Sequence, residues 1–104
     1  WHIPTQEEFA TLPTAVGGDG NTLKAIGQDG TSTNTSGFSA LFGGFRSNDG
    51  SWREGSNSFY SWISKEYEDN VNFADYRRLD TGNSTFFLIH NWKAFGLSVR
   101  CIKD

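Results

Sequence analysis

Turn-forming residues interrupt this chain so often that it has no room for a long helix. Twelve glycines and many Ser, Thr and Asn residues divide its 104 residues into short segments. Glycine adopts backbone conformations that other residues avoid, so a chain of this kind turns frequently. Nine Phe, four Trp and three Tyr must supply much of the core, since each aromatic side chain buries roughly 150–250 Å². These features predict one small domain over residues 1–104.

Helix signals open the chain and strand signals follow them. Thr5 and Glu8 have the spacing of a capping box, which predicts a short helix that stops or kinks at Pro13. Residues 21–26 favour a second helical turn, and the polar stretch 28–37 is expected to be a loop without buried groups. Helices followed by strands predict an α+β fold with a compact antiparallel sheet.

Period-two segments and turn residues locate the strands. Alternation begins at Phe38 and leads through Phe45 and Arg46 into a Ser-Asn-Asp-Gly turn at 47–50, with a return strand from Trp52. Further strands are expected at 59–64, 73–79 and 86–89, with a bend at 91–93 and a buried last strand over 96–102.

Charge and composition exclude several classes of partner. The net charge is −3 and the only adjacent basic pair is Arg77-Arg78, which is too little for a surface that follows nucleic-acid phosphates. No apolar run approaches the roughly 20 residues of a membrane span. Cys101 is the only cysteine, so we expect a buried free thiol, and it lacks the spacing to the two histidines that a metal site needs. The sequence predicts no nucleic-acid partner, no membrane insertion, no metal and no cofactor.

Several segments, taken in order, resemble one family. They are WHIPT at 1–5, GFSAL at 37–41, GGFR at 43–46, YSWISKE at 60–66, ADYRRL at 74–79 and GLSVRCIKD at 96–104. The series resembles the Fibrobacter succinogenes major paralogous domain, a set of bacterial surface modules, and extends to variable proteins of diversity-generating retroelements. The resemblance implies a C-type-lectin-like fold that carries a variable ligand-binding face for host or surface attachment. It also implies an extracellular location, on a cell surface or a virion.

The sequence departs from that family at its beginning. The family's first strand, and a cysteine just before the Trp-His pair, are not present here. The resemblance therefore implies a trimmed or minimal domain in which Cys101 lacks its usual partner. Some relatives form homotrimers, but the sequence itself specifies no oligomeric state.

The resemblance also implies positions whose residue type varies among relatives. They lie between residues that form the structural frame, which we call frame residues. These candidate ligand contacts are Ser61, Ile63, Asp75, Arg78 and Asp80. Strand alternation places Asp75 and Arg78 on opposite faces, so a bulge would be needed to turn both toward one ligand. Tyr76, Arg77 and Leu79 are expected to be frame residues. For Ser61 and Ile63, the pattern fits either an outward orientation on a binding surface or burial beneath a loop.

A second candidate group lies just before the closing segment. It consists of Ile89, His90, Asn91 and Trp92. Trp92 would supply a large, rigid contact area at low entropic cost, and covering the core is its alternative role. We expect His90 to be a solvated loop residue rather than a metal ligand.

These patterns favour a non-catalytic recognition domain over an enzyme. Formylglycine-generating enzymes share the broad fold but use a cysteine pair, which a single Cys101 cannot supply. Calcium-dependent lectins place a proline inside their sugar motif, whereas Pro4 and Pro13 both lie near the beginning of the chain. We therefore expect calcium-independent recognition of a protein or glycan. A structural or adhesive surface module and a glycan-binding lectin are the alternatives.

Overall fold

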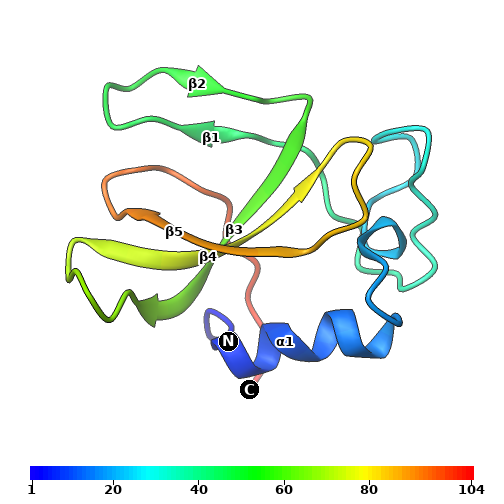
Figure 1. Cartoon of the computed structure of the whole chain (residues 1–104), viewed down its shortest axis with the longest axis horizontal. Helices are drawn as coiled ribbons and strands as arrows, with labels where there is room; N and C mark the ends of the chain where they lie inside the picture. Colours follow the sequence, from blue (N-terminus) through cyan, green and yellow to red (C-terminus); the bar gives the residue numbers. More distant parts are fainter.

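The computed structural model describes residues 1–104 and places one helix against a three-stranded antiparallel sheet, with a short hairpin on the other side (Figure 1). The elements are α1 (Gln6–Ala15), the 3₁₀ turn η1 (Gly20–Thr22), β1 (Phe45–Arg46), β2 (Trp52–Arg53), β3 (Ser58–Glu66), β4 (Phe73–Asp80) and β5 (Phe87–Trp92). The strand order is β3-β4-β5, and β1 pairs with β2 alone. The predicted α+β class with antiparallel pairing is confirmed. No helix combines the length and apolar character that crossing a bilayer requires.

The predicted capping box starts α1. The Glu8 amide donates to Thr5 Oγ1 at 3.1 Å, and the Thr5 amide donates to the Glu8 carboxylate at 2.8 Å. The expected stop at Pro13 is wrong, because α1 continues to Ala15. Pro13 lies in the last turn, where it removes only its own backbone donor, and the Val16 amide still donates to the Leu12 carbonyl at 3.2 Å.

The three-stranded sheet is covered on both faces. One face packs against Phe9 of α1 in a core that contains Phe59, Ile63 and Leu79. On the other face the Tyr76 ring contacts the rings of Tyr60 and Trp62. Side chains alternate across a strand, so neighbouring residues of β3 and β4 enter different environments.

A bulge bends β3 near its middle. Trp62 pairs with Tyr76, but the next pair joins Glu66 to Ala74, so β3 carries two more residues than β4 over this stretch. The bulged Ser64 amide donates instead to the Pro4 carbonyl at 2.8 Å. The irregularity therefore ties the segment before α1 to the sheet.

The last segment does not form the expected buried strand. Residues 96–102 make only isolated bridges, from Gly96 to Arg46, from Ser98 to Ser61 and from Ile102 to His2. Because each bridge has a different partner segment, no continuous ladder forms, and Cys101 is exposed rather than buried.

Three further boundaries differ from the prediction. The alternation from Phe38 produces no strand before β1, and only Ala40 bridges to Lys24. The expected bend at 91–93 begins later, because β5 extends to Trp92 and the turn starts at Lys93. The helical turn expected over 21–26 shrinks to η1, because the backbone after Leu23 leaves the helix to pair with Ala40.

Candidate functional site

A small cleft lies on the sheet face that points away from α1, and we name it the aromatic cleft. Its volume is about 180 Å³, and its lining residues are Phe45, Glu54, Tyr60, Tyr76, Arg78, Asn91, Phe95 and Leu97. Pockets for drug-sized ligands usually measure roughly 300–1,000 Å³. The aromatic cleft is therefore suited to a single ring or a single side chain.

Four rings hold the walls of the aromatic cleft in place. The Phe45 ring stacks on Phe95 with centroids 5.6 Å apart, and it meets Tyr60 edge-on at 5.2 Å. The Tyr60 ring also contacts Tyr76 at 5.6 Å. Because the rings come from β1, β3, β4 and the closing segment, distant parts of the chain fix one another and the cleft is preformed.

Glu54 enters the cleft from an unusual backbone conformation. Its φ is 55°, in the left-handed region that residues other than glycine seldom adopt. The Tyr60 hydroxyl donates to Glu54 Oε2 at 2.6 Å, which holds the carboxylate at the cleft. Uncommon backbone conformations concentrate at binding sites, so this position supports the assignment of the cleft as a functional site.

Arg78 brings a fixed positive charge to the same cleft. Its Nε donates to Asp80 Oδ1 at 2.6 Å, and Ser58 Oγ donates to the same oxygen at 2.7 Å. The guanidinium also lies over the Tyr60 ring, 5.5 Å from its centroid. The hydrogen bond to Asp80 raises the pKa of Arg78. This bond uses Nε and holds the guanidinium at the wall of the cleft.

Both phenols of the cleft stay protonated near neutral pH. Burial raises the pKa of Tyr60 far above its usual range, and its hydrogen bond to Glu54 raises that pKa further. Burial also raises the pKa of Tyr76. Protonated phenols can donate hydrogen bonds.

A second cleft involves the opposite face of the sheet, and we name it the acidic cleft. Its volume is about 260 Å³, and it is lined by Gln6, Lys65, Tyr67, Glu68, Asp69, Asp75, Leu88, Ile89 and His90. The His90 ring stacks on Tyr67 with centroids 3.7 Å apart. Asp75 and His90 are direct neighbours across β4 and β5, which explains why they share this cleft.

The structure divides the predicted ligand contacts between these two clefts. Arg78 and Asn91 line the aromatic cleft, and Asp80 holds Arg78 there. Asp75, Ile89 and His90 instead line the acidic cleft. The bulge that would turn Asp75 and Arg78 toward one ligand is absent from β4, because the sheet's irregularity lies in β3. The prediction that all the candidate ligand contacts lie on a single face is therefore wrong.

Two of the candidates are buried. Ser61 is fully buried and Ile63 belongs to the core around Phe9, so an outward orientation is wrong for both. They project opposite to Trp62, as expected, but α1 covers that face. The predicted frame residues Tyr76, Arg77 and Leu79 are all buried, which confirms their structural placement.

Trp92 fits neither of its two expected roles, which were a ligand contact and a cover over the core. Its side chain is 46% exposed, and its ring packs on Phe73 at 4.6 Å rather than on the core. It does not line either cleft. Trp92 is therefore no lid over the core.

Sequence reasoning missed most residues of the clefts. Strand alternation places Tyr60 on the same face as Trp62, and this signal could have identified Tyr60 as a cleft residue. No sequence pattern identifies Glu54 or Phe95 as cleft residues. A turn with positive φ brings Glu54 to the cleft, and the irregular bend after β5 brings Phe95 there. Lys65, Glu68 and Asp69 lie in a polar stretch whose contact with Asp75 follows only from the β3–β4 pairing.

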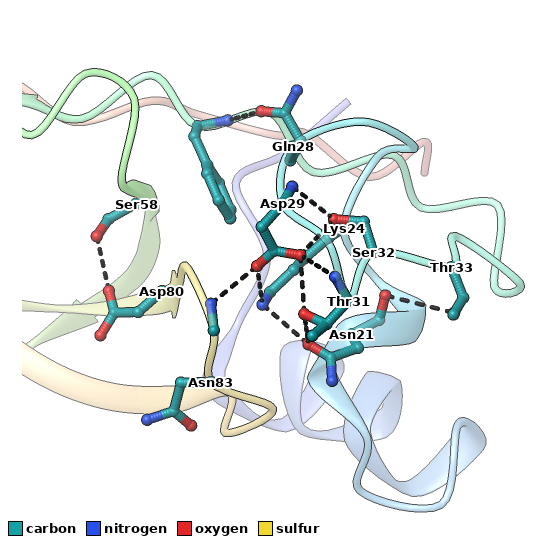
Figure 2. Close-up of polar contacts among 12 residues, drawn as sticks. Asn21, Lys24, Gln28, Asp29, Thr31, Ser32, Thr33, Ser58, Asp80 and Asn83 are labelled. Carbon is teal, nitrogen blue, oxygen red and sulfur yellow. Dashed lines mark hydrogen bonds and ion pairs between the residues drawn. The ribbon is translucent and has the colours of Figure 1, made fainter.

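A buried polar network holds the loop before β1 to the sheet (Figure 2). Lys24 Nζ, fully buried, donates to Asp29 Oδ2 at 2.8 Å and to Asn21 Oδ1 at 2.9 Å. Asp29 also accepts from the Gly82 amide at 2.9 Å and from the side chains of Thr31 and Ser32. The expectation that residues 28–37 contain no buried groups is wrong. This Lys24–Asp29 network joins the loop to the turn after β4.

Electrostatics in the network favour the charged pair. Burial alone would raise the pKa of Asp29, but hydrogen bonds from Lys24, Gly82 and Thr31 hold it far below its usual range. The side chain of Asp29 is only 7% exposed, so the network supports the frame and does not form a binding surface. No group of three or more His, Cys, Asp or Glu side chains is arranged to hold a metal ion.

Comparisons with known proteins agree with the sequence motifs at the level of the family. Searches of curated proteins and of solved structures each found no match. The model of the Fibrobacter succinogenes major domain matches residues 1–103, which is almost the whole chain and includes both clefts. This chain therefore belongs to the Fibrobacter succinogenes major domain family.

Proposed function

We propose that this chain is a non-catalytic recognition domain whose aromatic cleft takes one ring or side chain of a protein or glycan ligand. The observation that carries the proposal is the preformed wall of four rings beside the Arg78 guanidinium. Rigid aromatic side chains and arginine contribute large contact area and directed hydrogen bonds at low entropic cost. Glu54 and Asn91 add polar groups that set the orientation of the ligand.

The chemistry of the cleft supports binding without catalysis. The Tyr60 hydroxyl donates a hydrogen bond to the Glu54 carboxylate, and the protonated Tyr76 hydroxyl can donate to a ligand.

We further propose that the fold is C-type-lectin-like and that the chain is a variable protein of a diversity-generating retroelement. On this proposal the domain acts in attachment to a host or surface, outside the cell or on a virion. The family membership supports this proposal. The test is genomic. We expect a reverse-transcriptase gene beside the coding sequence, with a near-copy of the coding segment that differs mainly at adenines. A neighbourhood without both would contradict the diversification proposal and leave recognition by the cleft untouched.

Replacing Tyr76 with phenylalanine should weaken ligand binding and preserve the fold. The change keeps the buried ring and removes a hydroxyl that contributes roughly 0.5–1.5 kcal/mol, or about two- to twelvefold in affinity. Short glycan and peptide ligands would be selected on arrays with the whole domain, and their affinities measured by calorimetry. Thr35→Val also removes a hydroxyl, from an exposed loop residue outside both clefts, and should have no effect. Equal affinity of Tyr76→Phe and wild type for every selected ligand would contradict the proposal.

A further inference from the structure

Asp75 is a buried carboxylate without a partner in the protein. The residue is 7% exposed, and none of the hydrogen bonds or ion pairs in the structure involves its side chain. Its remaining exposure opens into the acidic cleft, which it lines. Burying a carboxylate is costly unless an opposite charge or hydrogen-bond donors compensate it. No group in the protein therefore compensates the cost of burying the Asp75 carboxylate.

Two cations lie near Asp75 in the fold, and neither pairs with it. Lys65 Nζ donates to Gln6 at 2.7 Å and lies 3.6 Å from the Glu68 carboxylate. Arg77 follows two residues later on the same face of β4. Its Nη1 donates to the Phe86 carbonyl at 3.2 Å and its guanidinium packs over the Phe86 ring, while its buried Nε has no partner. Neither side chain serves as the counter-ion of Asp75.

The surroundings of Asp75 favour a positive ligand. The acidic cleft contains the carboxylates of Glu68, Asp69 and Asp75 against the single ammonium of Lys65. The stacked Tyr67 and His90 rings form a wall beside them, and aromatic rings attract organic cations. A volume of about 260 Å³ admits the end of one long side chain. The carboxylates are not gathered into a group that could hold a metal ion.

We infer that the acidic cleft binds an organic cation, the guanidinium or ammonium group at the end of a basic side chain of a protein partner, with Asp75 as its counter-ion. The inference rests on the proposed recognition function and adds a second contact, on the opposite face of the sheet from the aromatic cleft. Arginine suits the site through its planar set of donors, and lysine through its compact charge.

Nuclear magnetic resonance titration of the whole domain tests this assignment. The probes are acetyl-arginine amide, acetyl-lysine amide and acetyl-citrulline amide, whose side chain has the shape of arginine without its charge. At least one cationic probe should produce saturable shifts at Tyr67, Asp75 and His90, and citrulline should bind at least tenfold more weakly. Equal shifts with citrulline, or no saturable shifts with either cation, would overturn the inference.

Asp75→Asn separates binding from folding. It should abolish the cation-dependent shifts while the melting temperature stays unchanged or rises, because the change removes an unpaired buried charge. Asp49→Asn removes the same charge from an exposed turn and should bind the probes like wild type. Retained cation binding in Asp75→Asn would contradict the assignment. If the cationic probes do not bind while array ligands still bind the aromatic cleft, only this inference is contradicted. If neither the probes nor the array ligands bind, the proposed function is contradicted as well.

Discussion

Replacing Lys24 with methionine should lower the free energy of unfolding by about 3–5 kcal/mol, which is the usual cost of breaking a buried ion pair from one side. Methionine fills a similar volume but leaves the Asp29 carboxylate buried without the ammonium that lies 2.8 Å from it. Chemical denaturation monitored by tryptophan fluorescence would measure the change. Lys65→Met removes a partly exposed lysine and should change the unfolding free energy by roughly 0.5 kcal/mol. A loss below about 1 kcal/mol for Lys24→Met would contradict the role of the network.

A second substitution distinguishes charge from packing at the same site. Asp29→Asn in the Lys24→Met background removes the unpaired charge and keeps an oxygen that can accept the hydrogen bond of the Gly82 amide. The double variant should therefore be more stable than Lys24→Met alone. If the double variant is the less stable of the two, lost packing rather than the unpaired charge explains the effect.

The network also predicts how the free energy of unfolding of the wild type changes as the pH falls. Because the pKa of Asp29 is lowered in the folded state, the unfolded chain binds the proton more tightly. The contribution of Asp29 to the free energy of unfolding should be fully present above the pKa of Asp29 in the unfolded chain, which is about 4. It should be lost progressively as the pH falls from there toward the much lower folded pKa.

Replacing Gly44 with alanine should cost at least about 2 kcal/mol and should also weaken ligand binding, because it combines backbone strain with a clash. Gly44 has a φ of 63°, and a Cβ there would lie 2.1 Å from the Arg53 carbonyl oxygen. The clash is with backbone, so β1 and β2 must separate. Glu54 follows Arg53 directly, so its contact with Tyr60 should be lost as well.

Gly43→Ala is the matched control for this prediction. A Cβ at Gly43 would meet only Ser98 Oγ, at 3.8 Å, and its backbone is not in the left-handed region. This variant should be as stable as wild type or slightly more stable, since alanine restricts the unfolded chain. Denaturation midpoints and array-ligand affinities would be measured for both variants. Equal values for Gly43→Ala and Gly44→Ala would show that the hairpin does not depend on this close approach.

The parts of the fold that sequence predicted well depend on local interactions. The Thr5–Glu8 capping box lies within one turn, so its residues alone indicate where α1 begins. β3 and β4 were predicted within two residues at each end, because alternation and the adjoining turns are visible in the sequence. The burial of Tyr76 and Leu79 followed from their expected frame role.

The parts that sequence could not predict depend on contacts between distant segments. Alternation shows that Ser61 and Trp62 face opposite ways, but only the position of α1 decides which of them is buried. The loop residue Asp29 is buried because the Gly82 amide, 53 residues away, reaches it. Similarly, Asp75 and Arg78 are near neighbours in sequence, yet the regular pairing of β4 sends them to different clefts.

Mapping the amide shifts caused by a bound array ligand tests the central claim most directly. The central claim is that the aromatic cleft is the recognition site of this domain. The largest shifts should fall at Phe45, Tyr60, Tyr76, Arg78 and Phe95, while amides in the Lys24–Asp29 network stay unchanged. A ligand that binds tightly but shifts mainly residues outside the aromatic cleft, for example the β1–β2 turn, would contradict the account.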